Sequence, residues 1–163
     1  MDLVARCIIA SLYTSDGPRK GTTFVVVLEG EPNPPVSITF DGNAMESVPA
    51  SEVMAAKIVH DSLSGLSIVG VTLERKSFEG VISNFQRSNF QLFYLHEEGE
   101  DSRISKIEER PVFILGDQKG LDPKSEQLLE SMKIKKISLG PHPYLASHCI
   151  TVVNNELDIR AKR

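Results

Sequence analysis

Hydrophobic residues recur along the chain in two alternating patterns, one with helical spacing and one typical of β-strands. Because predicted strands and helices alternate, we expect one α/β domain over residues 1–163, with a mostly parallel sheet flanked by helices. Apolar residues at helical spacing predict helices over residues 2–12, 49–63, 77–85, 123–132 and 145–157. Runs of β-branched and aromatic residues predict strands over residues 22–28, 36–40, 71–75, 90–95, 111–115 and 134–139.

Four segments carry more detailed expectations. Residues 22–28 are almost continuously apolar, which predicts a strand buried on both faces. Three prolines within residues 30–35 remove three amide donors and predict a stiff turn, so residues 36–40 would follow as the second strand of a hairpin or as an edge strand. Residues 96–109 are polar and acidic, which favours a loop. In the last helix, the side chains expected to face the core are Leu145, Cys149, Val152, Val153 and Leu157.

The composition excludes several classes of protein. Hydrophobic residues make up 40% of the 163 residues and charged residues 25%, which is typical of a folded chain and not of a disordered one. The formal net charge of −4 excludes a general nucleic-acid coat, so RNA binding would need a local basic patch. Two cysteines argue against a disulfide-built secreted scaffold. No apolar run has the length of a membrane span and no signal-peptide pattern is visible, so we expect a cytoplasmic domain that binds no membrane.

Candidate ligand-binding loops follow three of the predicted strands. They begin at Leu95-His96, at Gly116-Asp117 and at residues 139–144. In open parallel sheets, ligands bind beyond the carboxyl ends of the strands, and glycine lets the backbone approach a ligand closely. Such loops would suit a flat, partly apolar ligand held by backbone groups. Spacing alone favours the simpler interpretation, in which the glycines and prolines only form turns.

Familiar catalytic and metal-binding signatures are missing from the sequence. Neither GxGxxG nor GxxxxGK[ST] nor GxSxG occurs, and the four histidines do not fall at zinc spacings with the two cysteines, so no metal is expected. Cys7 and Cys149 are interpreted as small core residues. Basic clusters at residues 133–136 and 160–163 could contact phosphates, but they are more typical of solvated surface.

Longer segments of the chain resemble a known family. The stretches PVFILGDQKGL and KKISLGPHPYLASHCITVVNNELD resemble the cofactor-binding end of SPOUT-class RNA methyltransferases. The resemblance is closest to the TrmY type, the tRNA pseudouridine-N1-methyltransferases that act in the T-loop. LEGEPNPPVSITFDG, GVTLERKSFEGVI and LFYLHEEGED are similar to further segments of that family in the same order. The resemblance therefore covers nearly the whole chain.

The resemblance implies a SPOUT-type α/β fold in which about residues 90–163 form a deep trefoil knot, a feature that periodicity does not indicate. It implies S-adenosyl-L-methionine bound in the knot, a homodimer with the site near the subunit interface, and N1-methylation of the pseudouridine at position 54 in the T-arm of tRNA. Carried over by position, the cofactor contacts are Leu95, Gly116, Leu139, Gly140, Pro141, His142, Pro143, Tyr144 and Cys149.

The resemblance also assigns residues to the substrate side. Asp2 and Arg6 match an acidic and basic pair at the start of the family's first helix, which implies a catalytic or substrate-orienting role. Arg75 matches a family arginine and is expected to contact RNA through charge-assisted hydrogen bonds. Methyl transfer from a sulfonium needs mainly alignment, with a modest base or a nearby cation assisting the loss of the N1 proton.

The chain departs from the family pattern at its start. The family usually has a further N-terminal segment, with a strand and a Gly-Arg step just before the position of Asp2, so we expect either a shortened member or a true start upstream. Two other functions stay open beside the pseudouridine-N1-methyltransferase. One is a SPOUT ribose 2′-O-methyltransferase acting on tRNA or rRNA, and the other is a truncated, non-catalytic module that binds cofactor or RNA.

Overall fold

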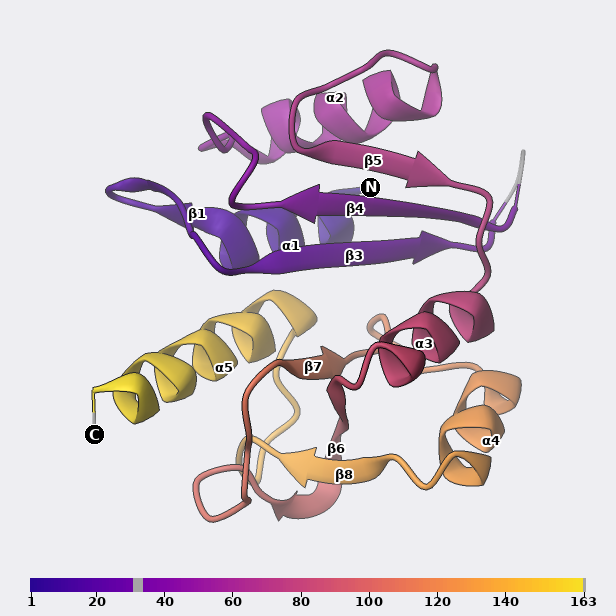
Figure 1. The fold of residues 1–163 in the computed structure, drawn as a ribbon, viewed down its shortest axis with the longest axis vertical. Coiled ribbons are helices and arrows are strands. Elements are labelled where there is room, and N and C mark those ends of the chain that lie inside the picture. Colours follow the sequence, from indigo (N-terminus) through magenta and orange to yellow (C-terminus); the bar gives the residue numbers. More distant parts are fainter. Residues whose placement is uncertain (31–33, 163) are drawn as a thin grey trace. The chain divides into compact units, whose positions relative to one another are not determined.

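The computed structural model describes residues 1–30 and 34–162, which fall into two compact units, residues 1–78 and the remainder from residue 79 (Figure 1). A single methyltransferase domain over residues 1–163 stays a prediction. The middle of the predicted turn at residues 30–35, including part of the PNPP motif, lies outside the described residues, as does Arg163 of the last basic cluster.

The first unit is an antiparallel sheet covered by two helices. The sheet has the strand order β3-β4-β5, and alternate side chains of the central strand, among them Ile38 and Phe40, pack against Ile8 and Val59 of the helices in one core. A short antiparallel pair, β1 and β2, follows the first helix. The elements are α1 (Asp2–Leu12), β1 (Tyr13–Thr14), β2 (Gly17–Pro18), β3 (Thr23–Leu28), β4 (Val36–Asp41), α2 (Glu52–Leu63) and β5 (Val71–Glu74).

The prediction of a mostly parallel sheet is wrong for this unit. The predicted hairpin is confirmed, because β4 runs antiparallel to β3, but β4 lies at the centre of the sheet and β5 takes the edge. The strand expected to be buried on both faces, β3, is only half-buried over most of its length. A run of β-branched residues predicts a strand but carries no signal for the direction of its neighbours.

The second unit holds the parallel sheet that the sequence predicts, flanked by helices. Its order is β7-β6-β8, with the central strand paired in parallel to both neighbours. Helix α4 connects the two outer strands, as a crossover between parallel strands requires. The elements are α3 (Phe78–Arg87), β6 (Gln91–Asp101), β7 (Pro111–Ile114), α4 (Pro123–Ser131), β8 (Lys135–Ser138) and α5 (Ala146–Ala161).

Two expectations for the second unit are wrong. The loop predicted from His96 is partly strand, because β6 continues to Asp101 and pairs again with the end of β8. This stretch has no apolar residue whose period could reveal a strand. Of the residues expected to face the core from the last helix, Val153 is buried and Cys149 and Leu157 are half-buried. Leu145, which is the N-cap of α5, and Val152 are 49% and 37% exposed and do not face the core.

Candidate functional site

The carboxyl ends of the three parallel strands lie at one edge of the second sheet. Tyr94 of β6 pairs with Ile114 of β7 on one side and with Lys136 of β8 on the other, and the next residue, Leu95, pairs with Ile137. The strands therefore end at nearly the same level. The loops that follow them share this edge, where open parallel sheets bind their ligands. The structure thus brings together the three loops that the sequence singles out.

The first loop is a four-residue bulge within β6. Both Leu95 and Glu100 pair with Ile137, so residues 96–99 are extruded at the carboxyl end of β8. Gly99 makes this return possible, because a Cβ there would lie within about 2.5 Å of the Ile137 backbone. Sequence reasoning missed Gly99, although a lone glycine in a polar strand-end segment is a typical signal of a bulge or of a close backbone approach.

The second loop follows β7 and turns tightly on itself. The backbone amide of Gly120 donates to the Asp117 carbonyl at 3.0 Å, and the Lys119 amide donates to the Asp117 side chain at 2.7 Å. Gly116 packs directly on the far side of this turn, since a Cβ at Gly116 would lie 2.5 Å from the Gly120 oxygen and from the Leu121 nitrogen. The space that a side chain at Gly116 would need is therefore filled by the backbone of residues 120 and 121.

The third loop follows β8 and is exposed from residue 141 to residue 145. Gly140 has a φ of +148°, and a Cβ built on it would lie 3.8 Å from the Tyr144 ring. The Cys149 thiol donates to the Tyr144 carbonyl at 3.7 Å. Burial raises the pKa of this thiol, and the nearby Glu97 carboxylate adds to the rise, so the thiol keeps its proton at neutral pH and is a poor nucleophile.

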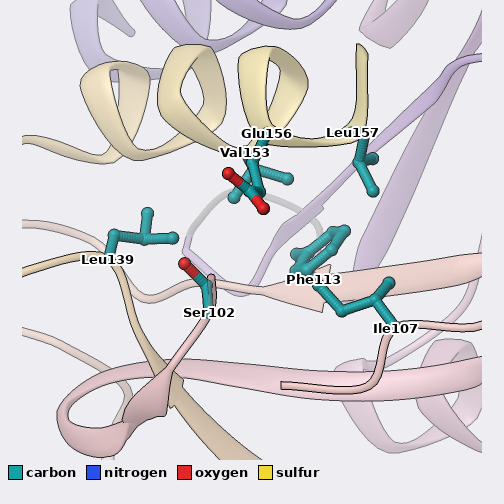
Figure 2. A pocket seen from close by; sticks show the side chains of 7 residues that line it. All are labelled: Ser102, Ile107, Phe113, Leu139, Val153, Glu156 and Leu157. Carbon is teal, nitrogen blue, oxygen red and sulfur yellow. The ribbon is translucent and has the colours of Figure 1, made fainter. Parts of the chain in front are cut away.

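A small hollow lies beside this edge, between β7 and α5. It measures about 190 Å³, including space open to solvent, and Figure 2 shows the side chains that line it. Among the predicted cofactor contacts, Leu139 alone belongs to the lining. The residues are Ser102, Ile107, Phe113, Leu139, Val153, Glu156 and Leu157.

Arg160 fastens the end of α5 to the turn that follows β6. Its guanidinium donates to the carbonyl of Ser102 at 2.6 Å, to that of Ser105 at 3.1 Å and to the Glu156 carboxylate at 2.8 Å. The sequence pattern predicts that Arg160 belongs to a solvated basic cluster. In the structure, its guanidinium instead makes hydrogen bonds within the second unit. Hydrogen bonds from a charged group to buried carbonyls are among the stronger ones in proteins.

Asp101, at the start of the same turn, has a pKa that depends on its hydrogen bonds with Arg103. The side chain of Arg103 donates to Asp101, and the Arg103 backbone amide donates to it as well, which together lower the pKa of Asp101 from 3.8 to about 2. The associated stability is therefore present above pH 3.8 and is lost as the pH falls toward 2. We expect Arg103→Ala to raise the Asp101 midpoint toward 3.8 in an NMR titration of the carboxyl carbon. A midpoint unchanged near 2 would show that this side-chain contact is absent in solution.

The residues assigned to the substrate all belong to the first unit. Asp2 lies in the first turn of α1 and Arg6 lies one turn later on the same helix. The Nε atom of Arg6 is buried, and among the described residues it has no hydrogen-bond partner. Arg75 is exposed directly after β5. The three strand-end loops, by contrast, belong to the second unit.

Comparison with models of known protein families identifies the family of this chain. A family model described as "Putative SAM-dependent RNA methyltransferase" matches residues 1–161. The chain belongs to this family. S-adenosylmethionine is accordingly the methyl donor, and the protein is an RNA methyltransferase.

Curated relatives match almost the whole chain. A protein of Methanocella arvoryzae is 37% identical over 98% of this chain and 85% of its own length. A protein of Methanocaldococcus jannaschii is 33% identical over 97% of this chain and 83% of its own length. Both are named tRNA (pseudouridine(54)-N(1))-methyltransferase.

A solved structure is similar in fold. Nep1 of Archaeoglobus fulgidus, bound to S-adenosylhomocysteine, superposes with a TM-score of 0.68 at 14% identity, over 99% of this chain and 71% of that one. The prediction of an α/β fold is thereby confirmed.

Within residues 1–30 and 34–162, no three histidine, cysteine, aspartate or glutamate side chains gather closely enough to hold a metal ion. No helix in the same part of the chain is long and apolar enough to span a membrane.

Proposed function

We propose that this protein methylates N1 of the pseudouridine at position 54 in the T-loop of tRNA, with S-adenosyl-L-methionine as donor. The observation that carries the proposal is the name shared by the curated relatives, which are 33–37% identical over nearly the full chain. The strand-end loops of the parallel sheet support it, because they gather backbone groups and apolar side chains at one edge.

The cofactor side of the site is proposed to be residues 95, 116, 139–144 and 149. The loop of residues 141–145 is exposed, so its backbone groups can meet an adenine ring, which is flat and is recognised through hydrogen bonds at its edge. Cys149 supplies an uncharged wall. When bound, the cofactor supplies an electrophilic methyl group on a sulfonium. The Glu97 carboxylate, whose charge is felt at both Tyr94 and Cys149, adds a favourable field for that positive charge.

The substrate side is proposed to be Asp2, Arg6 and Arg75. The buried Nε of Arg6 has an unused donor among the described residues, which supports a role in binding an acceptor on the nucleotide. Asp2, one turn away on α1, can orient the base or accept its N1 proton. Arg75 is proposed to contact the RNA backbone or a base edge. Because the leaving group is already activated, these residues act mainly by alignment.

We further infer that the protein is a cytoplasmic homodimer whose residues from about 90 to 163 are threaded into a trefoil knot. Support for the dimer comes from α5, where Val152 and Ile159 lie seven residues apart and are 37% and 42% exposed. Residues seven apart share one face of a helix, and an exposed apolar stripe of this kind is typical of a helix that packs on a partner. We expect Val152→Glu to shift the sedimenting species from dimer to monomer, and a wild-type protein that sediments as a monomer would contradict the inference.

Transfer of labelled methyl groups tests the proposed activity. The wild-type protein is expected to label a T-arm RNA that carries pseudouridine at position 54 and to leave the same RNA with uridine unlabelled. Equal labelling of both RNAs would contradict the proposal and favour ribose 2′-O-methylation, in which the base at position 54 is not the target.

A further inference from the structure

Tyr94 lies on the central strand of the parallel sheet, and its hydroxyl lies against the loop that follows β7 and the start of α4. The residue lies on the central strand β6 and is 4% exposed. Its hydroxyl donates to the Glu126 carboxylate of α4 at 2.9 Å. The backbone amide of Leu121, the last residue before the α4 cap, interacts with the same oxygen. One buried hydroxyl therefore joins the central strand, the loop and the helix.

Leu121 connects this hydroxyl to the backbone surface at Gly116. The space that a Cβ on Gly116 would need is filled by the Gly120 carbonyl and the Leu121 nitrogen, so a shift of Leu121 must also alter the packing around Gly116. On the helix side, the Asp122 carboxylate caps α4 through the amides of Lys124 and Ser125, which ties the loop to the helix that carries Glu126.

The electrostatic surroundings keep the Tyr94 hydroxyl a constant donor. Burial, followed by the hydrogen bond to Glu126, raises the pKa of Tyr94 to about 12. Glu97 acts in the same direction from the bulge within β6, and the Lys136 ammonium of β8 lies 5.9 Å from the ring centre. His96 contacts the edge of the ring at 5.4 Å between centroids. The Tyr94 hydroxyl therefore keeps its proton at neutral pH and remains a donor to Glu126.

We propose that Tyr94, through Glu126 and Leu121, is a positioning residue that holds the loop of residues 116–121 in its cofactor-binding conformation. The inference rests on the proposed assignment of Gly116 to the cofactor site. A loop that is already ordered does not lose conformational freedom when the ligand binds, so the link contributes to affinity without touching the ligand. The transfer step itself, once the cofactor is bound, depends on other residues.

The test compares Tyr94→Phe and Glu126→Gln with Glu130→Gln. Glu130 lies one turn further along α4 in an exposed pair with Lys136, so it controls for the loss of a carboxylate from this helix. Titration calorimetry with S-adenosylhomocysteine is expected to show a Kd about five- to tenfold higher for Tyr94→Phe and for Glu126→Gln, and an unchanged Kd for Glu130→Gln. The Kd of the double variant is expected to be no higher than that of the single variant with the higher Kd, because both changes break the same hydrogen bond between Tyr94 and Glu126.

Two further readouts separate positioning from a general loss of structure. In Tyr94→Phe, the KM for S-adenosylmethionine is expected to rise while kcat changes less than twofold, and hydrogen exchange is expected to accelerate at residues 116–121 but not in α5. A Kd equal to wild type in Tyr94→Phe, or fully additive effects of the two changes, would overturn the inference while leaving the proposed function intact. A wild-type protein that fails to bind S-adenosylhomocysteine would overturn the cofactor site itself.

Discussion

Replacing Gly116 with alanine is expected to weaken the binding of S-adenosylhomocysteine by at least 100-fold, equivalent to about 2.7 kcal/mol. The added methyl group would lie 2.5 Å from the Gly120 oxygen and the Leu121 nitrogen, and both are backbone atoms that no rotamer change can move aside. The turn must therefore open, and the surface proposed to receive the adenosyl group is lost. Titration calorimetry on the folded variant measures the effect.

The matched control for this change is Gly30→Ala. Among the residues that the structure describes, nothing lies within 4 Å of a Cβ built at Gly30, and Gly30 has no positive φ, so this variant is expected to bind like the wild type. Binding of S-adenosylhomocysteine by Gly116→Ala within threefold of the wild type would show that the loop after β7 does not form the cofactor site. Because calorimetry reports binding directly, the result does not depend on which RNA is the substrate.

The second large effect is expected on stability. Gly99→Ala should destabilise the second unit by about 2–4 kcal/mol, because its Cβ would lie within about 2.5 Å of the Ile137 backbone, where β6 returns onto β8. Overpacking against backbone is relieved only by moving one strand, and this strand is central to the sheet. Urea unfolding followed by circular dichroism measures the change, again with Gly30→Ala as the control. An unfolding midpoint equal to that of the wild type would mean that the bulge is arranged differently in solution.

The helices and most of the strands are predictable from the sequence because their apolar residues have a clear period. The hydrophobic pattern does not predict a strand segment that is held by backbone hydrogen bonds alone. His96 to Asp101 has no apolar position, so its pairing with Ile137 and Ser138 leaves no trace in the hydrophobic pattern. The pattern fails again in α5, where apolar residues on several faces make Leu145 and Val152 resemble core residues although both are exposed.

The strand-end loops of the candidate site are predictable from the sequence, whereas the long-range contacts that support them and the proposed substrate residues are not. Three loops after parallel strands must share an edge of the sheet, and the register around Leu95 shows that these do. The link from Tyr94 to Glu126 joins residues 32 positions apart, and the clamp of Arg160 on Ser102 spans 58 positions. No local pattern encodes such contacts. The proposed substrate pair, Asp2 and Arg6, is implied by the family resemblance alone. The structural feature that supports it is the buried Nε of Arg6, which has no hydrogen-bond partner among the described residues.

The most direct test of the proposed function is the identity of the nucleoside that the protein produces. A tRNA carrying pseudouridine at position 54 is incubated with the protein and S-adenosyl-L-methionine, digested, and analysed by liquid chromatography and mass spectrometry. The proposal predicts 1-methylpseudouridine at position 54 and no other new methylated nucleoside. A ribose-methylated product, or no methylated product from a protein that binds S-adenosylhomocysteine, would contradict it.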